Sequence, residues 1–522
     1  MEMMWFLIFI LSLLITFFFK SLLFPSKPST PKLKGTVLPP GPTAIPIIGN
    51  FIWLFKLASG IEPILFDLHA KYGPVVSLPI PFSSHPTVFI NDHSLAHQAL
   101  VQNGAVCADR PPPQPITKLI TSNNRVIFSS GYGPTWRLLR RNLMSEILNP
   151  SRVKSYAGSR KWALDILTNR LDQSVSSNGP VVAVLDHFRI SITSLFVYMV
   201  FGVKVEDEAK MKEIVDIQRR FIYGLVRGFM TLNLGPRWLN KILFRKGWNQ
   251  FYEIRKQQKD VLLPFIRARK KVKQERVEKK NDDVKIAYVD TLMDLEDPHE
   301  KRAFNEGELL DQCTEIVNSG TDTMSVALQW TMANVVKHPR VQNRLVKEID
   351  EVLGVGKEEV KEEDLQKMYY LKAVVMEALR LHPPGHFVVP HSVTEEIVLD
   401  GRYTVPKNWT VNCMVAEMGR DPSVWNEPME FKPERFLSDG DNIQCDITGS
   451  KEIKMMPFGA GRRICPGWSL SLLLLEYLVA NLVWKYEWEA VDGVGIDLTE
   501  KQEATWVMKN PLQARISPRL NK

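Results

Sequence analysis

The feature that most constrains the fold is a glycine-rich loop that ends at a cysteine and leads into a long, mostly apolar segment. The loop reads FGAGRRICPG and covers residues 458–467, and WSLSLLLLEYLVANLVW follows directly at 468–484. A segment of this length and character, without Gly or Pro, is expected to form a buried helix. Cys465 would then lie just before the N-terminus of that helix, where the helix dipole favours a thiolate.

The neighbours of Cys465 favour the binding of a flat, anionic ligand. Glycines let the backbone come close to such a ligand, Phe458 can shield the sulfur, and Arg463 can bind a carboxylate through two hydrogen bonds. The alternative is a buried structural cysteine in a glycine-rich turn. The loop resembles the haem-binding loop of the cytochrome P450 superfamily, F-x-x-G-x-R-x-C-x-G, and matches it at Phe458, Gly461, Arg463, Cys465 and Gly467. The resemblance implies haem b as the cofactor, Cys465 as the axial ligand of its iron, and Phe458, Arg463 and Gly467 as haem contacts.

A second motif lies in a long helical pattern that is expected to cover residues 306–336. The segment SGTDT at 319–323 places an acid beside an alcohol in mid-helix, where a Thr hydroxyl can bond to the carbonyl four residues back. Taken alone, such a pair can be a simple polar patch. It resembles the superfamily's oxygen-binding motif, A/G-G-x-D/E-T-T/S, which implies that Asp322 and Thr323 deliver protons to bound dioxygen. Two positions depart from the motif and leave the efficiency of delivery open: Ser319 and Met324.

A third motif predicts an ion cluster that supports the haem loop. Glu377 and Arg380 form an E-x-x-R sequence, and this spacing places both on one helix face. The segment FKPERF at 431–436 resembles the family segment whose arginine joins this pair, which implies a buried cluster of Glu377, Arg380 and Arg435. Alone, E-x-x-R is common and carries little information.

Three further residues are assigned to haem contacts. Trp136 and Arg140 have the W-x-x-x-R spacing of the family helix beside the haem, and lie about one helical turn apart. His391 follows Pro390 where the family often has another propionate contact, although it could also be a plain surface histidine.

The order of the motifs along the chain extends the resemblance to the whole sequence. It implies the cytochrome P450 fold, mainly α with small β-sheets, and a monooxygenase that uses O2 and electrons derived from NADPH. The hinge PPGPTAIPIIGN and the phrase DRPPP at 109–113 are similar to plant microsomal members, above all the plant 89A family and after it the 77 family. That likeness points to linear tetrapyrroles or fatty acyl compounds as substrates.

The N-terminus predicts a membrane anchor. Residues 3–19 carry no charge, and with the extension to Phe24 the apolar stretch is long enough to cross a bilayer of ~30 Å. Glu2 precedes the stretch and lysines follow it, which favours an anchor over a cleaved signal peptide and places the following residues in the cytosol. We therefore expect a single-pass anchor at 1–24 in the endoplasmic reticulum membrane, a Pro-rich hinge at 25–50 and a catalytic domain at 51–522.

Composition limits the remaining possibilities. The net charge is +8, but the charges are scattered, apart from one mixed stretch at 267–283 that is expected to be a solvated helix end and loop; this pattern does not favour nucleic acid as a partner. Five cysteines without a C-x-x-C pair give no disulfide framework, so four of them, all except Cys465, are expected to be buried thiols.

The hydrophobic periodicity of other segments predicts further elements. Helices are expected at 159–173 and 214–228, and strands near 75–78, 87–90 and 397–405.

The expected partners are NADPH–cytochrome P450 reductase, the membrane and a small apolar or amphipathic substrate. Basic residues on the cysteine side of the haem would contact the reductase, with Arg137, Arg141 and Lys451 as candidates. Two other classes stay open: a haem-thiolate isomerase or dehydratase that needs no dioxygen, and a non-catalytic haem protein. The candidates for the substrate pocket, each of which could instead be a core residue, are Ile127, Phe128, Val317, Val388, Val389 and Trp506.

Overall fold

The computed structural model describes most of the chain after the predicted hinge. The described residues are 35–42, 60–80, 85–233, 237–279, 286–354, 359–437, 445–493 and 495–519, with the single positions 12, 52, 53, 56 and 83. The predicted anchor, apart from Ser12, and most of the hinge lie outside them. None of the helices in the described part of the chain is both long and apolar enough to cross a bilayer.

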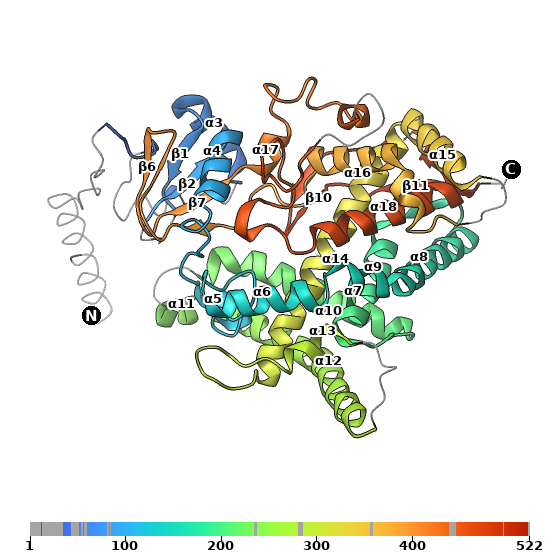
Figure 1. Cartoon of the computed structure of the whole chain (residues 1–522), viewed down its shortest axis with the longest axis horizontal. Coiled ribbons are helices and arrows are strands. Elements are labelled where there is room, and N and C mark those ends of the chain that lie inside the picture. Colours follow the sequence, from blue (N-terminus) through green and yellow to red (C-terminus); the bar gives the residue numbers. More distant parts are fainter. Residues whose placement is uncertain are drawn as a thin grey trace, which may run out of the picture. The chain divides into compact units, whose positions relative to one another are not determined.

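The chain divides into two compact units, which are described separately. One comprises Met1–Pro111 and Phe387–Met414, and the other Pro112–His386 and Val415–Lys522. Helices make up most of the second unit, and the sheets are small in both (Figure 1). The predicted mainly α class with small β-sheets is therefore confirmed.

The first unit is built on a four-stranded sheet in the order β1-β2-β7-β4. β2 is antiparallel to β1 and parallel to β7, and β4 is antiparallel to β7. The predicted strand at 397–405 is a separate two-stranded hairpin, β5 and β6. The bounds are α3 Glu62–Tyr72, β1 Val75–Leu78, β2 Thr87–Ile90, α4 His93–His97, η1 Gln98–Gln102, β4 His391–Ser392, β5 Ile397–Leu399, β6 Tyr403–Val405 and β7 Thr410–Cys413.

The second unit contains the long helices, and the three helical patterns read from the sequence fall within α8, α10 and α14. The mixed-charge stretch at 267–283 continues α12 as far as Lys279, and its remainder lies outside the described residues. The bounds are α5 Pro115–Ile120, α6 Pro134–Glu146, α7 Pro150–Ser155, α8 Ala157–Asn178, α9 Leu185–Phe201, α10 Glu208–Thr231, α11 Arg237–Leu243, α12 Arg245–Lys279, α13 Tyr288–Leu292, α14 Glu306–Lys337, α15 Pro339–Leu353, α16 Tyr369–Leu381, α17 Val415–Gly419 and α18 Trp468–Lys485.

Two small sheets and three short 3-10 helices complete the second unit. β3, β11 and β8 form one antiparallel sheet, and β9 and β10 form a hairpin near the C-terminus. The bounds are β3 Val181–Ala183, η2 Asp364–Lys367, η3 Pro433–Phe436, η4 Gly461–Arg463, β8 Tyr486–Ala490, β9 Glu500–Gln502, β10 Trp506–Met508 and β11 Gln513–Pro518.

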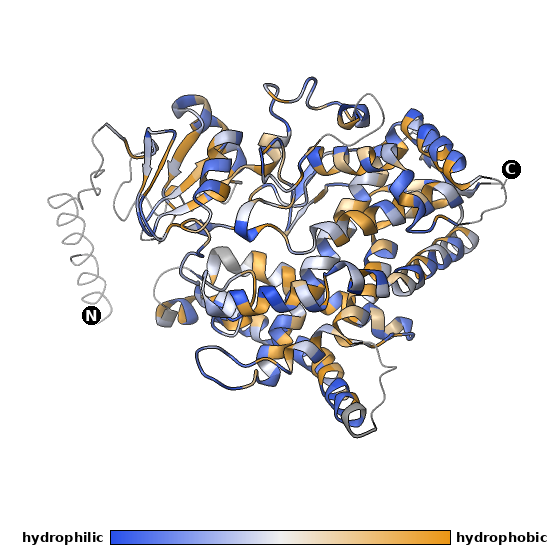
Figure 2. Ribbon diagram, viewed as in Figure 1, coloured by the Kyte–Doolittle hydropathy of each residue, from blue (hydrophilic) through white to orange (hydrophobic). Residues whose placement is uncertain are grey.

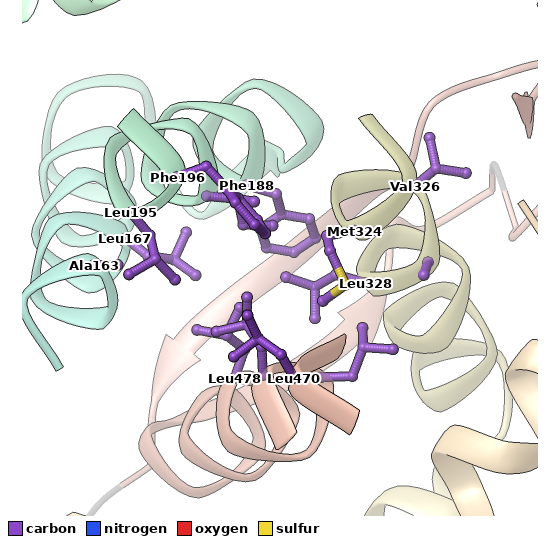
Figure 3. Packing of buried hydrophobic residues seen from close by; sticks show 14 of the residues in the cluster. Ala163, Leu167, Phe188, Leu195, Phe196, Met324, Val326, Leu328, Leu470 and Leu478 are labelled. Carbon is purple, nitrogen blue, oxygen red and sulfur yellow. The ribbon is translucent and has the colours of Figure 1, made fainter. Parts of the chain in front are cut away.

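The core of the second unit lies where α8, α9, α14 and α18 pack together (Figure 3). α18 is largely hydrophobic and mostly buried, as its sequence predicts (Figure 2). α14 begins with a capping box in which the Asn305 side chain accepts the Glu308 N–H at 3.0 Å and the Glu308 carboxylate accepts the Asn305 N–H at 2.8 Å. The core residues labelled in Figure 3 are Ala163, Leu167, Phe188, Leu195, Phe196, Met324, Val326, Leu328, Leu470 and Leu478.

Gly320 is the position on α14 that lets α9 come close. A Cβ at Gly320 would lie 2.5 Å from the ring of Phe196, which is far inside van der Waals contact. The glycine of the SGTDT segment therefore has a packing reason as well as its place in the motif.

Candidate active site

The glycine-rich loop folds back on itself just before α18. The N–H of Cys465 donates to the carbonyl of Phe458 at 2.8 Å, and the helix begins three residues later at Trp468, as predicted. Gly459 has a φ of +70°, a conformation that glycine adopts without strain. A Cβ on Gly459 would meet nothing within 4 Å, and one on Gly467 only the Ser471 Oγ at 3.9 Å. The loop backbone can therefore be approached closely by a flat ligand.

The Cys465 thiol is subject to opposing electrostatic effects. Burial among protein atoms raises its pKa, whereas the backbone N–H of Gly467 and the guanidinium of Arg140 lower it. Burial is the largest effect, so the helix terminus alone does not produce the thiolate that the sequence suggested. The residue as a whole is nevertheless partly accessible.

An indole and two guanidinium groups lie together beside Cys465. The Arg140 Nη2 on α6 donates to the carbonyl of Ile464 at 2.7 Å. The guanidinium carbons of Arg463 and Arg140 lie 4.8 and 6.0 Å from the ring centroid of Trp136, which is buried. Burial lowers the pKa of Arg140, and the charge of Cys465 opposes this shift. The structure thus brings together four predicted site residues from two distant parts of the sequence.

Arg463 also connects the cysteine loop to the segment before α6. Its Nη1 donates to the carbonyl of Ile127 at 3.1 Å and its Nη2 to the carbonyl of Ser130 at 2.6 Å. The hydroxyls of Ser129 and Ser130 are buried and have no hydrogen-bond partner among the described residues. Guanidinium and hydroxyl donors together suit an anionic oxygen ligand such as a carboxylate.

The acid and the alcohol of α14 have different partners. Thr323 Oγ1 donates to the carbonyl of Ser319 at 2.5 Å, which confirms the predicted bond to the carbonyl four residues back. Asp322 Oδ2 instead accepts from the Oγ1 of Thr505 at 2.9 Å, at the tip of the β9–β10 hairpin. Burial raises the pKa of the Asp322 carboxyl, and the Thr505 bond partly offsets the shift. Thr505 was not among the predicted residues, since no local pattern connects positions so distant in the sequence.

The Glu377 cluster has the predicted members. Glu377 and Arg380 are fully buried, and the two nitrogens of Arg380 lie 2.7 and 2.8 Å from the Glu377 carboxylate oxygens. Arg435 Nε contributes a third bond at 3.0 Å, and the Lys432 N–H a fourth at 2.8 Å. Arg380 also donates to the carbonyls of Gly419 and Pro428. Each charged group of the cluster contacts one of opposite sign, because the two guanidinium groups share the single carboxylate of Glu377.

The predicted pocket residues of the second unit differ in burial. Ile127 and Val317 belong to the apolar core, whereas Phe128 is 41% exposed. Trp506 is buried at the start of β10, with its ring stacked on His386 at a centroid distance of 4.3 Å. Their contact with a substrate stays a prediction.

Three predicted site residues belong to the first unit. His391 is buried on β4, with its Nδ1 2.6 Å from the carbonyl oxygen of Cys107, so it is not a surface histidine. Val388 is buried and Val389 is 49% exposed. Their part in the site stays a prediction.

One protein-family model matches nearly the whole chain. The family model described as Cytochrome P450 matches residues 39–517. The chain belongs to the cytochrome P450 family. This P450 is 47% identical over 493 residues to Cytochrome P450 89A9 of Arabidopsis thaliana, with 92% of this chain and 94% of the relative covered. It is 30% identical over 491 residues to Cytochrome P450 71A9 of Glycine max, with 92% and 91% covered.

Solved structures share the fold of this P450. Two structures of a zebra fish cytochrome P450, one with abiraterone and one with progesterone, superpose with TM-scores of 0.69 and 0.71 at 21% and 22% identity. Each alignment covers 88% of this chain and 100% of the zebra fish chain. The predicted fold, the resemblance to the plant 89A family and the assignment as a P450 monooxygenase are confirmed.

Proposed function

We propose that this P450 acts at the endoplasmic reticulum membrane, takes electrons from NADPH–cytochrome P450 reductase and inserts one atom of O2 into an apolar or amphipathic small organic substrate. The observation that carries the proposal is the grouping of Trp136, Arg140 and Arg463 around Cys465. The family relationship supports the same class of reaction.

The residues at Cys465 fit a haem b. Cys465 would bind the iron through its sulfur. Arg140 and Arg463, which both lie within about 6 Å of the Trp136 ring, would bind the propionates, and Phe458 would shield the sulfur. When bound, a haem with a thiolate ligand supplies the activation of dioxygen. The protein supplies the orientation of the ligand and the protons.

The proposed proton donor is the carboxyl of Asp322. Its pKa is raised by burial, so this carboxyl holds its proton at higher pH than an exposed aspartate does. The Thr323 hydroxyl, anchored on the Ser319 carbonyl, is the proposed neighbour in the relay. The Thr505 hydroxyl donates to Asp322 Oδ2, so the proton of the carboxyl would be held on the other oxygen, Oδ1.

The proposed docking surface for the reductase lies on α6. Arg137 and Arg141 are exposed one helical turn apart, and with Arg140 they line a surface cavity of about 720 Å³. Clustered positive charge attracts and orients an acidic partner. Lys451, the third candidate, is exposed in the same unit.

The proposed attachment to the membrane rests on the apolar stretch at residues 3–24. Removing residues 1–24 is expected to release the protein from a microsomal pellet while leaving haem binding intact. If the protein that lacks residues 1–24 stayed in the pellet after extraction at high pH, attachment through this stretch alone would be contradicted.

The cofactor assignment is tested by the spectrum of the reduced protein with carbon monoxide. The intact chain is expected to give the red-shifted Soret band of a thiolate-bound haem, and Cys465→Ser is expected to lose it. Cys445→Ser is the matched control, because Cys445 is also a free, partly accessible cysteine and should leave the band unchanged. A normal band in Cys465→Ser would overturn the assignment.

The reaction class is tested by the requirements for turnover. Linear tetrapyrroles and fatty acyl compounds, the classes to which the 89A resemblance points, are the first substrates to screen by spectral titration. Product formation is expected to need NADPH, reductase and O2 together. Turnover with a peroxide substrate in the absence of O2 and NADPH would favour the isomerase or dehydratase alternative, and haem binding without turnover of any substrate would favour a carrier.

A further inference from the structure

Four polar side chains on α14 form a continuous row that binds one loop, residues 121–130. Their spacing of three, one and three residues places them on one face of the helix. Three of them are buried although they carry charge or an amide, so each needs a partner. The row consists of Glu308, Asp311, Gln312 and Glu315.

The first three members bind the beginning of the loop. The hydroxyl of Ser122 donates to Asp311 Oδ2 at 2.6 Å, and Arg125 Nη1 donates to Glu308 Oε1 at 2.6 Å. The Gln312 side chain donates to the carbonyl of Arg125. Both the side chains and the backbone of this part of the loop are therefore fixed to α14.

Glu315 binds the backbone itself. Its Oε2 accepts the N–H of Ile127 at 2.9 Å and its Oε1 accepts the N–H of Phe128 at 2.5 Å. A carboxylate that accepts two consecutive backbone N–H groups makes charge-assisted bonds, which are stronger than neutral ones. These two residues are the pocket candidates of the loop.

The opposite edge of the same segment faces the cysteine loop. The carbonyls of Ile127 and Ser130 accept from the two terminal nitrogens of Arg463. Residues 127–130 therefore bridge α14 and the arginine that is proposed to bind the haem. A shift of this segment would move both the pocket side chains and the carbonyls that orient Arg463.

The conformation of the loop is one that the sequence would rarely adopt unaided. Ser122, Asn123 and Asn124 are consecutive residues with φ of 45°, 59° and 67°. Asn tolerates this left-handed region better than most residues, but three in succession without glycine are uncommon. Such a conformation persists where surrounding contacts hold it. The row on α14 supplies one of these contacts, the bond from Ser122 to Asp311, and Thr121 supplies another by accepting the Asn124 N–H at 2.9 Å.

We propose that Glu315 is a positioning residue that fixes the Ile127–Phe128 backbone between α14 and Arg463, and so determines the shape of the substrate pocket. The inference rests on the proposed function for the meaning of the pocket, whereas the fixed loop can be measured without any substrate. Glu315 touches neither cofactor nor reacting atoms in this role.

The test compares Glu315→Gln with Glu306→Gln in the full-length, haem-loaded protein. Gln keeps the size of the side chain, but its NH2 group cannot accept the second N–H. Glu306 is the matched control, because it lies on the same helix and pairs at the surface with Arg267 at 2.9 Å. Amide hydrogen exchange of the peptide that contains residues 121–130 is expected to accelerate about tenfold or more in Glu315→Gln and to stay unchanged in Glu306→Gln.

A second measurement separates positioning from general stability. Dodecylamine serves as the probe of the pocket, and its spectral dissociation constant is expected to rise several-fold in Glu315→Gln, with the urea midpoint of the whole protein nearly unchanged. Unchanged exchange, or faster exchange throughout the protein with an equal loss of stability, would overturn the inference. If the unaltered protein gives no NADPH-dependent product, the proposed function fails while the exchange result still decides the role of Glu315.

Discussion

Replacing Arg380 by Met is the sharpest test of the buried ion cluster. Arg380 and Glu377 are both fully buried, and two of the four bonds to the Glu377 carboxylate come from Arg380. Met has a similar length and no charge, so the substitution removes the guanidinium with little change in volume. The carbonyls of Gly419 and Pro428, which accept from Arg380 at 2.6 and 2.8 Å, lose a donor at the same time.

The expected cost follows from the partners that remain. Glu377 keeps Arg435 as its counter-charge and the Lys432 N–H, but it loses two of its four hydrogen bonds. Losing charge-assisted bonds to a fully buried carboxylate, together with the donor of two carbonyls, is expected to cost about 3–5 kcal/mol. Arg435→Met should cost less, about 1.5–3 kcal/mol, because Arg435 makes a single bond to the carboxylate and its side chain is 11% exposed.

The assay is urea unfolding of the haem-loaded full chain, followed by tryptophan fluorescence and by circular dichroism. Lys485→Met is the control, because the Lys485 Nζ lies 2.8 Å from Asp172 but both side chains are more than 40% exposed. Such a pair contributes only about 0–1 kcal/mol. A loss of stability in Arg380→Met no larger than in Lys485→Met would refute the argument that the cluster is buried and fully engaged.

Three further predictions concern single side chains. Burial raises the pKa of Glu476 to about 7, so its contribution to stability is present below its usual pKa of 4.5 and is lost as pH rises through about 7. Glu476→Gln is therefore expected to add about 1–3 kcal/mol to the free energy of unfolding at pH 8 and almost nothing at pH 4, and equal effects at both would contradict the shift. Thr505→Val should shift the pH profile of turnover and lower the product formed per NADPH, because it removes the bond to Asp322; an unchanged profile and coupling would remove Thr505 from the relay. Gly320→Ala should cost about 1–3 kcal/mol by overpacking against Phe196, and Phe196→Leu should recover part of it; a neutral Gly320→Ala would contradict the close contact.

Local patterns predict those elements of the fold whose residues all lie within one short segment of the sequence. The helical periodicity of residues 306–336 is local, and it predicts α14 to within a residue of its observed end. The capping box at Asn305 is equally local, although it was not part of the prediction. The E-x-x-R pair is local for the same reason, since residues three apart on a helix always share a face. Division into two compact units left no comparable trace, because the first unit combines chain segments that are far apart in the sequence.

The predicted position of Cys465 just before a helix is confirmed, but the electrostatic argument for its thiolate was incomplete. The helix dipole contributes typically 0.3–1 kcal/mol in favour of a thiolate. A buried anion pays a larger desolvation penalty, and the pKa of the thiol is accordingly raised. Sequence reasoning identifies what lies next to a residue along the chain, but the balance of burial against nearby charge depends on the folded surroundings.

The partners of Asp322 and of the pocket loop show which kind of contact stays hidden in a sequence. Thr505 is separated from Asp322 by 183 residues, and Glu315 from Ile127 by 188. Glu315 binds backbone N–H groups, which every residue except proline has, so the bonded residues carry no type that a pattern could detect. A row of polar residues at three- and four-residue spacing on an otherwise buried helix is the only available signal. Such a row needs buried partners. Arginines complement Glu308 and Asp311, whereas Glu315 takes loop backbone as its partner, which no residue type in the sequence indicates.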